Sequence, residues 1–216
     1  MKARVAKIER KTQEVQIRGR LNLDGTGRSS VATGVRFLDH MLELFAKHGL
    51  FDLELKAKGD LEIDLHHTNE DLGLALGEAF KKALGQKRGI RRMGSVFVPM
   101  DESLARVRSV VDLSGRPFFR LDWTAKRDAD SFRRASDRRA GWDRRAGFPY
   151  DLTDAKHFLE SFVVESRITV HVDVLKADGD IHHILEAVFK ALGRSLREAV
   201  ERDPRVKGVP STKGRL

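Results

Sequence analysis

The N-terminal half of the chain switches between two hydrophobic periods. Residues 3–9 and 15–23 place apolar side chains at every second position, which predicts two half-buried strands. The turn at Asp24–Gly27 favours a hairpin over a phosphate-binding loop, which would need a further glycine and a lysine. After a short strand at 29–33, a helix over 37–48 collects its apolar residues on one face, and Gly49 is expected to close it.

Further elements complete the first unit, and a similar series then forms a second one. Strands are predicted at 50–56 and 61–65, followed by an amphipathic helix ending near Gly85. Further strands follow at 95–99, 105–112 and 169–177, and a helix follows over 185–200. The pattern predicts an α+β protein in which one α/β unit is used twice. The repeats span about residues 3–92 and 93–200 of a single domain over 1–216, with a tail at 201–216.

A short motif, His-His-x-x-Glu, occurs once in each repeat, at His66–Glu70 and at His182–Glu186. In a helix the first histidine and the glutamate lie one turn apart on one face, where both can reach one cation. The second histidine points about 100° away and is free for a different ion. Nitrogen and oxygen donors suit Zn, Mn, Fe or Ni.

A third histidine repeats in register with the motif. His40 precedes His66 by 26 residues, and His157 precedes His182 by 25. A single such motif is more often a solvated turn than a metal site, but its duplication with a third histidine favours metal binding. The candidate metal ligands are His40, His66, His67, Glu70, His157, His182, His183 and Glu186.

Composition narrows the class of protein. The 216 residues contain no cysteine, which excludes disulfides and thiolate ligands and fits a reducing compartment. Without a signal sequence or a long apolar run, we expect a soluble, cytoplasmic protein that binds no membrane. The net charge of +9 also suits a nucleic-acid-binding module. Residues 126–145, however, hold eight Lys/Arg against four Asp, which is typical of a solvated insertion, placed here at 127–146.

Other polar residues remain open on the sequence alone. Residues 86–92 gather four cations around a glycine and form either a phosphate clamp or a solvated basic turn. His48 is either a helix-end cap or a substrate contact. The polar tail over 209–214 would ordinarily fray.

Eight blocks of sequence together resemble one enzyme family. They are Leu23–Gly27, Phe37–Leu42, Asp64–Asp71, Lys87–Arg91, Pro99–Glu102, Val111–Pro117, His182–Glu186 and Pro210–Gly214. In this order, over nearly the whole length, they are similar to the imidazoleglycerol-phosphate dehydratase family of histidine biosynthesis. These enzymes remove water from imidazole glycerol phosphate to give imidazole acetol phosphate.

The resemblance implies a fold, a cofactor and an assembly. It implies two α/β halves, each a small sheet covered by helices on one face, as in ribosomal protein S5 domain 2-like folds. It implies two Mn²⁺ ions per active site, bound by the eight candidate ligands, and a homo-oligomer of 24 subunits with sites between subunits. The partner would be a phosphorylated imidazole substrate and not a nucleic acid. The predicted substrate-binding residues are Glu14, His40, His48, Arg92, Arg116, Lys190, Ser211 and Lys213. With Ser211 and Lys213 on the phosphate, the resemblance implies that the tail is ordered over a ligand and not frayed.

The chain departs from the family pattern in four places. Val15 stands where the family usually has Thr, and residues 127–146 and one residue within 176–180 look inserted. Two extra residues around Val107–Val110 would form a longer strand or a bulge. Either would change whether Arg92 reaches the substrate phosphate.

The expected chemistry gives the carboxylates different roles. A metal would acidify the substrate's imidazole, and Glu14 is expected to take the carbon proton as general base. Glu70 and Glu186 are expected to act mainly as metal ligands, coupled at most to proton movement. A dinuclear metallohydrolase acting on a phosphate ester would use the same ligands and stays an alternative.

Overall fold

The computed structural model describes residues 3–100, 107–123, 150–175 and 181–216, which form two sheets and their helices. The first repeat contains β1 (Val5–Lys11), β2 (Val15–Asn22), β3 (Ser29–Ala32), α1 (Arg36–Gly49), β4 (Asp52–Gly59) and α2 (Leu65–Leu84). The second contains β5 (Met93–Val98), β6 (Val107–Asp112), β7 (Phe118–Trp123), α4 (Leu152–Ser166), β8 (Thr169–Val174) and α5 (Ile181–Val200). The sheet orders, β1-β2-β4-β3 and β5-β6-β8-β7, match strand for strand. The predicted duplication of an α/β unit is therefore confirmed.

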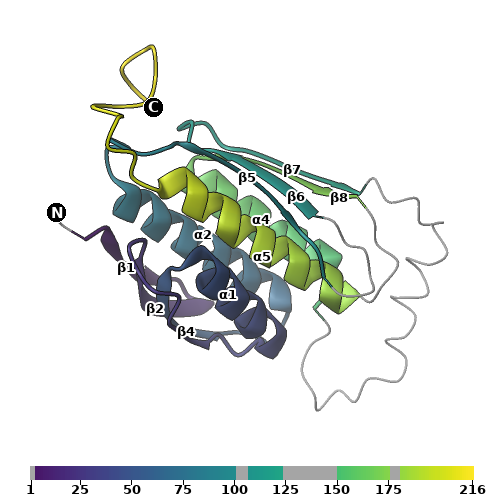
Figure 1. Cartoon of the computed structure of the whole chain (residues 1–216). Coiled ribbons are helices and arrows are strands. Elements are labelled where there is room, and N and C mark those ends of the chain that lie inside the picture. The colour runs from purple at the N-terminus through teal and green to yellow at the C-terminus, as the bar shows by residue number, and fades with distance from the viewer. Residues whose placement is uncertain (1–2, 101–106, 124–149, 176–180) are drawn as a thin grey trace.

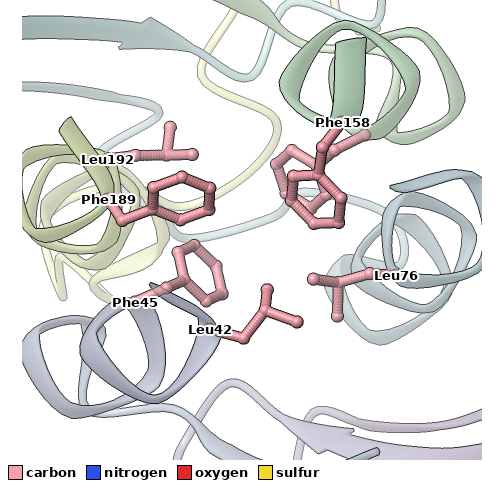
Figure 2. A pocket seen from close by; sticks show the side chains of 7 residues that line it. Leu42, Phe45, Leu76, Phe158, Phe189 and Leu192 are labelled. Carbon is pink, nitrogen blue, oxygen red and sulfur yellow. The ribbon is translucent and has the colours of Figure 1, made fainter. Parts of the chain in front are cut away.

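The helices lie between the two sheets (Figure 1). α1 and α2 cover one face of the first sheet, α4 and α5 cover one face of the second, and α1 packs on α5 while α2 packs on α4. Figure 2 shows where the four helices meet, and the side chains there leave no room for a water molecule. They are Leu42, Phe45, Leu76, Phe158, Phe162, Phe189 and Leu192. This apolar centre joins the halves into one body because each half supplies part of it.

Two glycines at equivalent positions bring the paired helices together. Gly77 and Gly193 each lie eleven residues after the first histidine of their motif. A Cβ on Gly77 would lie 2.5 Å from the Phe162 carbonyl oxygen, and one on Gly193 would lie 2.5 Å from that of Phe45. Only glycine permits this approach. The helices of each pair run in the same direction, so residues near their N-terminal ends face one another.

The predicted hairpin at Asp24–Gly27 is wrong. β3 does not return along β2 but pairs in parallel with β4. The turn is bound to Asp52 at the start of β4, whose Oδ1 accepts hydrogen bonds from the backbone N–H of Thr26 (2.9 Å) and Arg28 (3.1 Å). These bonds hold the pKa of Asp52 well below its usual range. The turn is thus bound to the start of β4, a strand distant in sequence. A local sequence pattern does not reveal this contact.

One predicted strand is absent, and one helix is capped by a different residue than expected. The expected strand at 61–65 is absent, because Asp64 caps α2 by accepting from the His66 N–H, and Ile63 of the apparent alternation is 71% exposed. Gly49 is the last residue of α1, but the left-handed residue that caps the helix is Leu50, with a φ of 53°. A Cβ on Gly49 would lie 2.5 Å from the Phe51 ring and 3.2 Å from the Gly193 carbonyl oxygen. Glycine is required there by packing and not by the helix end.

The bulge considered around Val107–Val110 does not occur. β5 and β6 pair without interruption from Met93 with Asp112 to Val98 with Val107. The insertion at 127–146 and the extra residue within 176–180 lie outside the described residues. Within the described parts of the chain, no helix is long and apolar enough to cross a membrane.

Candidate metal and substrate site

Three predicted ligands meet between α1 and α5. His40 Nε2 lies 2.9 Å from Glu186 Oε1, and His182 Nε2 lies 3.0 Å from the same oxygen. Lys190, one turn further along α5, donates a hydrogen bond of 2.7 Å to Glu186 Oε2. One ligand atom from each of His40, His182 and Glu186, named here the Glu186 cluster, lies within 4.8 Å of the others. Such a set can bind a single cation.

The carboxylate of Glu186 is held in its ionised form. Burial alone would raise its pKa, but hydrogen bonds from Lys190 and His40 lower that pKa to about 2. Its neighbours are therefore arranged around a negative charge, as an anionic metal ligand requires.

A second group, the Glu70 cluster, lies between α2 and α4 and consists of His66, Glu70 and His157. Its ligand atoms also lie within 4.8 Å of one another. The rings of His66 and His157 are 4.3 Å apart, and His66 Nε2 lies 3.9 Å from Glu70 Oε2. The Glu70 side chain is 44% exposed, against 10% for Glu186. Leu74 stands where the other cluster has Lys190, so the two sites share ligands but differ in charge.

Each cluster combines the two repeats. The histidine of α1 joins the motif on α5, and the histidine of α4 joins the motif on α2. The sequence predicted three histidines and one glutamate per half without showing this exchange. It follows from the packing of α1 on α5 and of α2 on α4, in which His40 and His157 face the opposite half.

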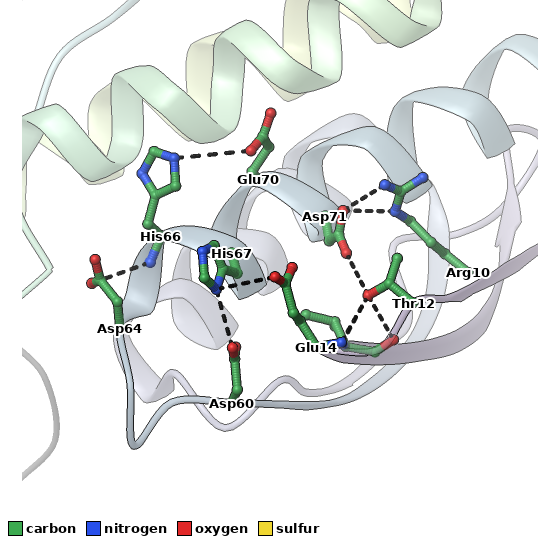
Figure 3. A network of polar contacts seen from close by, with 10 residues as sticks. Arg10, Thr12, Glu14, Asp60, Asp64, His66, His67, Glu70 and Asp71 are labelled. Carbon is green, nitrogen blue, oxygen red and sulfur yellow. Dashed lines mark hydrogen bonds and ion pairs between the residues drawn. The ribbon is translucent and has the colours of Figure 1, made fainter.

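The second histidine of each motif lies outside these clusters. His67 Nδ1 is 3.0 Å from Asp60 Oδ2 and 3.9 Å from Glu14 Oε1 (Figure 3). The hydrogen bond to Asp60 and then the charge of Glu14 raise the pKa of His67 against the opposing effect of burial. His183 contacts the ring of His182 edge-on at 5.9 Å. Both second histidines are thus turned away from their own glutamates, as the spacing predicts.

Four of the predicted substrate residues lie in or near the clusters, and His40 is itself part of the Glu186 cluster. Lys190 binds Glu186, and Glu14 lies beside His67. Burial lowers the pKa of His48, and the charges of Lys190 and Arg194 lower it further. His48, in the last turn of α1, therefore lies in a cationic environment that includes Lys190 and Arg194.

The other predicted substrate residues lie at the far end of the helices. The Arg92 N–H donates to the Ala199 carbonyl near the end of α5. Its guanidinium binds Asp112 at 2.7 and 3.1 Å and the Pro210 carbonyl at 2.8 Å. The hydrogen bonds to Asp112 raise the pKa of Arg92. Arg92 thus joins β6 to the tail.

The C-terminal tail follows residues 89–92 in an ordered path. The Gly89 N–H donates to the Gly208 carbonyl, and the Arg91 N–H donates to the Glu201 carbonyl. The tail is therefore held against residues 89–92 and is not frayed there, in line with the order that the family resemblance implies. This region is named here the cationic end and is defined by Arg92, Arg116, Ser211 and Lys213. The side chains of Arg116 and Lys213 are exposed.

The cationic end is remote from the clusters of the same chain. His182 and Ala199 are seventeen residues apart on α5. At about 1.5 Å of rise per residue, roughly 25 Å separate them. Within one chain, the predicted phosphate-binding residues therefore lie far from the two clusters of predicted metal ligands.

Comparison with known proteins decides the family. The family model described as imidazoleglycerol-phosphate dehydratase matches residues 33–196. The chain belongs to the imidazoleglycerol-phosphate dehydratase family. It is 49% identical over 213 residues to the enzyme of that name from Thermoanaerobacter pseudethanolicus, covering 99% of this chain and 100% of that one. It is also 49% identical over 215 residues to that of Thermobifida fusca, with the same shares covered.

Solved structures of imidazoleglycerol-phosphate dehydratases share the fold. The enzyme from Pyrococcus furiosus superposes with a TM-score of 0.73 at 31% identity, covering 96% of this chain and 99% of that one. The enzyme from Staphylococcus aureus gives 0.72 at 30% identity, with 92% and 99% covered. The chain is accordingly an enzyme of the hydro-lyase class.

Two residues of this imidazoleglycerol-phosphate dehydratase family member were missed by the sequence reasoning. Asp60, the partner of His67, follows β4, and Asp112, the partner of Arg92, ends β6. Asp60 lies seven residues before His67 but in a loop outside the motif, and Asp112 lies in the Val111–Pro117 block, twenty residues from Arg92. Only the pairing of strands and helices brings these carboxylates into place.

Proposed function

We propose that the chain catalyses the metal-dependent dehydration of D-erythro-imidazole glycerol phosphate to imidazole acetol phosphate in L-histidine biosynthesis. The observation that carries this proposal is the pair of His-His-Glu clusters, each assembled from both repeats, in a chain of this family. A cytoplasmic location remains a prediction.

The donor set fits two transition-metal ions, for which we propose Mn²⁺. Each cluster offers two imidazole nitrogens and one carboxylate oxygen, a combination suited to such ions and short of a full coordination sphere. His67 and His183 face away from the clusters beside them. They would complete the coordination spheres of metal ions bound by other clusters. When bound, the metal supplies Lewis acidity, which makes a coordinated imidazole lose its N–H proton more readily.

The protein's own groups would move the carbon proton and hold the substrate. Glu14 is 52% exposed and lies 3.9 Å from His67, so its carboxylate is accessible beside a proposed ligand. We propose that Glu14 accepts the carbon proton. Lys190 and His48 would orient the substrate near the Glu186 cluster, and the cationic end would bind its phosphate.

Because the cationic end lies roughly 25 Å from the clusters in one chain, the proposed site takes its phosphate contacts from another subunit. A homo-oligomer with sites between subunits satisfies this requirement. We propose the assembly of 24 subunits that the family resemblance implies.

The decisive test is an assay of the purified protein in buffer with defined Mn²⁺, together with metal analysis. We expect formation of imidazole acetol phosphate that stops when a chelator removes the metal. Release of inorganic phosphate from the same substrate, without dehydration, would instead indicate a metallohydrolase.

We expect His67→Ala or His183→Ala to lower the metal content below that of the wild type, which should hold about two ions per chain, because each removes one imidazole donor. The measurement is elemental analysis of the purified variants. His171→Ala is the matched control, since His171 lies on β8 and contacts Phe118, outside both clusters. Full occupancy in both variants would remove these two residues from the ligand set.

A further inference from the structure

Asp60 makes a contact with His67 that the proposed mechanism does not use. Its Oδ2 lies 3.0 Å from His67 Nδ1, within hydrogen-bond distance, whereas Glu14 lies 3.9 Å from the same nitrogen. The Asp60 side chain is 12% exposed, against 52% for Glu14. The nearer and more buried carboxylate is therefore the one that fixes the ring.

The position of Asp60 is set by close packing against the first turn of α2. Gly59, the last residue of β4, lies so near Thr68 that a Cβ would meet the Thr68 hydroxyl. Gly59 also pairs with Val15, beside Glu14. Asp60 is thus placed by a strand end that is itself held against the helix carrying His67.

The second oxygen of Asp60 strengthens the case for a dedicated role. Asp60 Oδ1 is buried and has no hydrogen-bond partner among the described residues, so His67 supplies the hydrogen bond that the carboxylate makes there. Buried polar side-chain atoms usually have at least one hydrogen-bond partner, which Asp60 Oδ1 lacks among the described residues. This arrangement is not what a structural carboxylate needs, but it suits one that serves a single imidazole.

An ionised carboxylate only accepts hydrogen bonds, so the proton of a neutral His67 ring lies on Nδ1. Nε2 then carries the lone pair, and it has no partner among the described residues. Carboxylates that accept from one nitrogen of a histidine orient the other nitrogen toward a metal. In the clusters, by contrast, the Nε2 atoms of His40 and His182 face the glutamate directly.

We infer that Asp60 is a positioning residue, which fixes the tautomer and orientation of His67 so that Nε2 is offered to a metal ion. This inference rests on the proposed metal-dependent function. It also separates the two carboxylates beside His67: Asp60 holds the ring, and Glu14 remains free for the substrate.

The test compares Asp60→Ala and Asp60→Asn with Glu62→Gln, which removes a charge from an exposed residue of the same loop. Titration calorimetry with Mn²⁺ should show weaker binding of one ion, by about 10- to 100-fold in Asp60→Ala and less in Asp60→Asn. Glu62→Gln should bind as the wild type does. With Co²⁺ as the probe, the visible absorption of Asp60→Ala should shift toward that of His67→Gln. Asp60→Asn keeps the shape of the side chain and so provides the measurement if Asp60→Ala does not fold.

A double-mutant cycle separates positioning from general destabilisation. In a His67→Gln background, Asp60→Ala should change Mn²⁺ affinity no further. An equal loss with and without His67 would mean that Asp60 acts on the fold, and the inference would be overturned. Unchanged affinity and spectrum in folded Asp60→Ala would overturn it as well. A wild-type protein that takes up no metal would instead refute the proposed function.

Discussion

Glu14→Gln is expected to lower turnover by about 10²- to 10⁴-fold, the range typical of a lost general base, with the metal content unchanged. The amide keeps the size of the side chain but cannot accept the substrate's carbon proton. Glu14 is well exposed and makes no contact shorter than 3.9 Å with His67, so its replacement leaves the ligand clusters intact. The measurement is kcat together with metal analysis in one buffer with defined Mn²⁺.

Glu70→Gln and Glu186→Gln provide the contrast. Each replaces an anionic ligand by a neutral amide, so metal content should fall in both. The loss of Glu186 also leaves Lys190 without the carboxylate that it contacts at 2.7 Å. Normal turnover in Glu14→Gln would show that Glu14 is not the base. If Glu14→Gln lost metal while Glu70→Gln kept it, the roles proposed for these carboxylates would be reversed.

The repeat made much of this structure predictable. The spacing of His40, His66, His157 and His182 indicated one unit used twice, and the two sheets confirm it. Helical geometry also predicted that His67 would turn away from Glu70, as it does toward Asp60. These inferences succeeded because they depend on periodicity within a helix or on similarity between halves, which the sequence records directly.

Contacts between distant elements were not predictable in the same way. The exchange of His40 and His157 between halves depends on which helices pair, and no local pattern records that. The turn at Asp24–Gly27 resembled a hairpin because its partner, Asp52, lies a helix away in the chain. The alternation at 61–65 resembled a strand although Asp64 begins a helix there. In each case a tertiary contact or a cap overrode a local preference.

The second prediction with a large effect is that two variants, each inactive alone, restore dehydratase activity when they assemble together. Arg116→Ala combined with Lys213→Ala should lower kcat/KM by about 10- to 100-fold for each lost phosphate contact. Both side chains are exposed, so the fold should not change. Co-expressed in equal amounts with Glu14→Gln, this double variant should form mixed particles. In these, half of the chains supply an intact Glu14 and the other half an intact cationic end, so up to about a quarter of the sites combine both and the activity should reach about that fraction of the wild type.

The reasoning depends on the separation of the two ends within a chain. Glu14 lies beside the first turn of α2, whereas Arg116 and Lys213 lie toward the other end of the helices, so one site draws on two chains. Differently tagged chains allow mixed particles to be purified and assayed. Particles of each variant, mixed only after assembly, form the control and should stay inactive. Mixed particles as inactive as their parents would mean that each site is completed within one chain, by a rearrangement that brings the cationic end to the clusters.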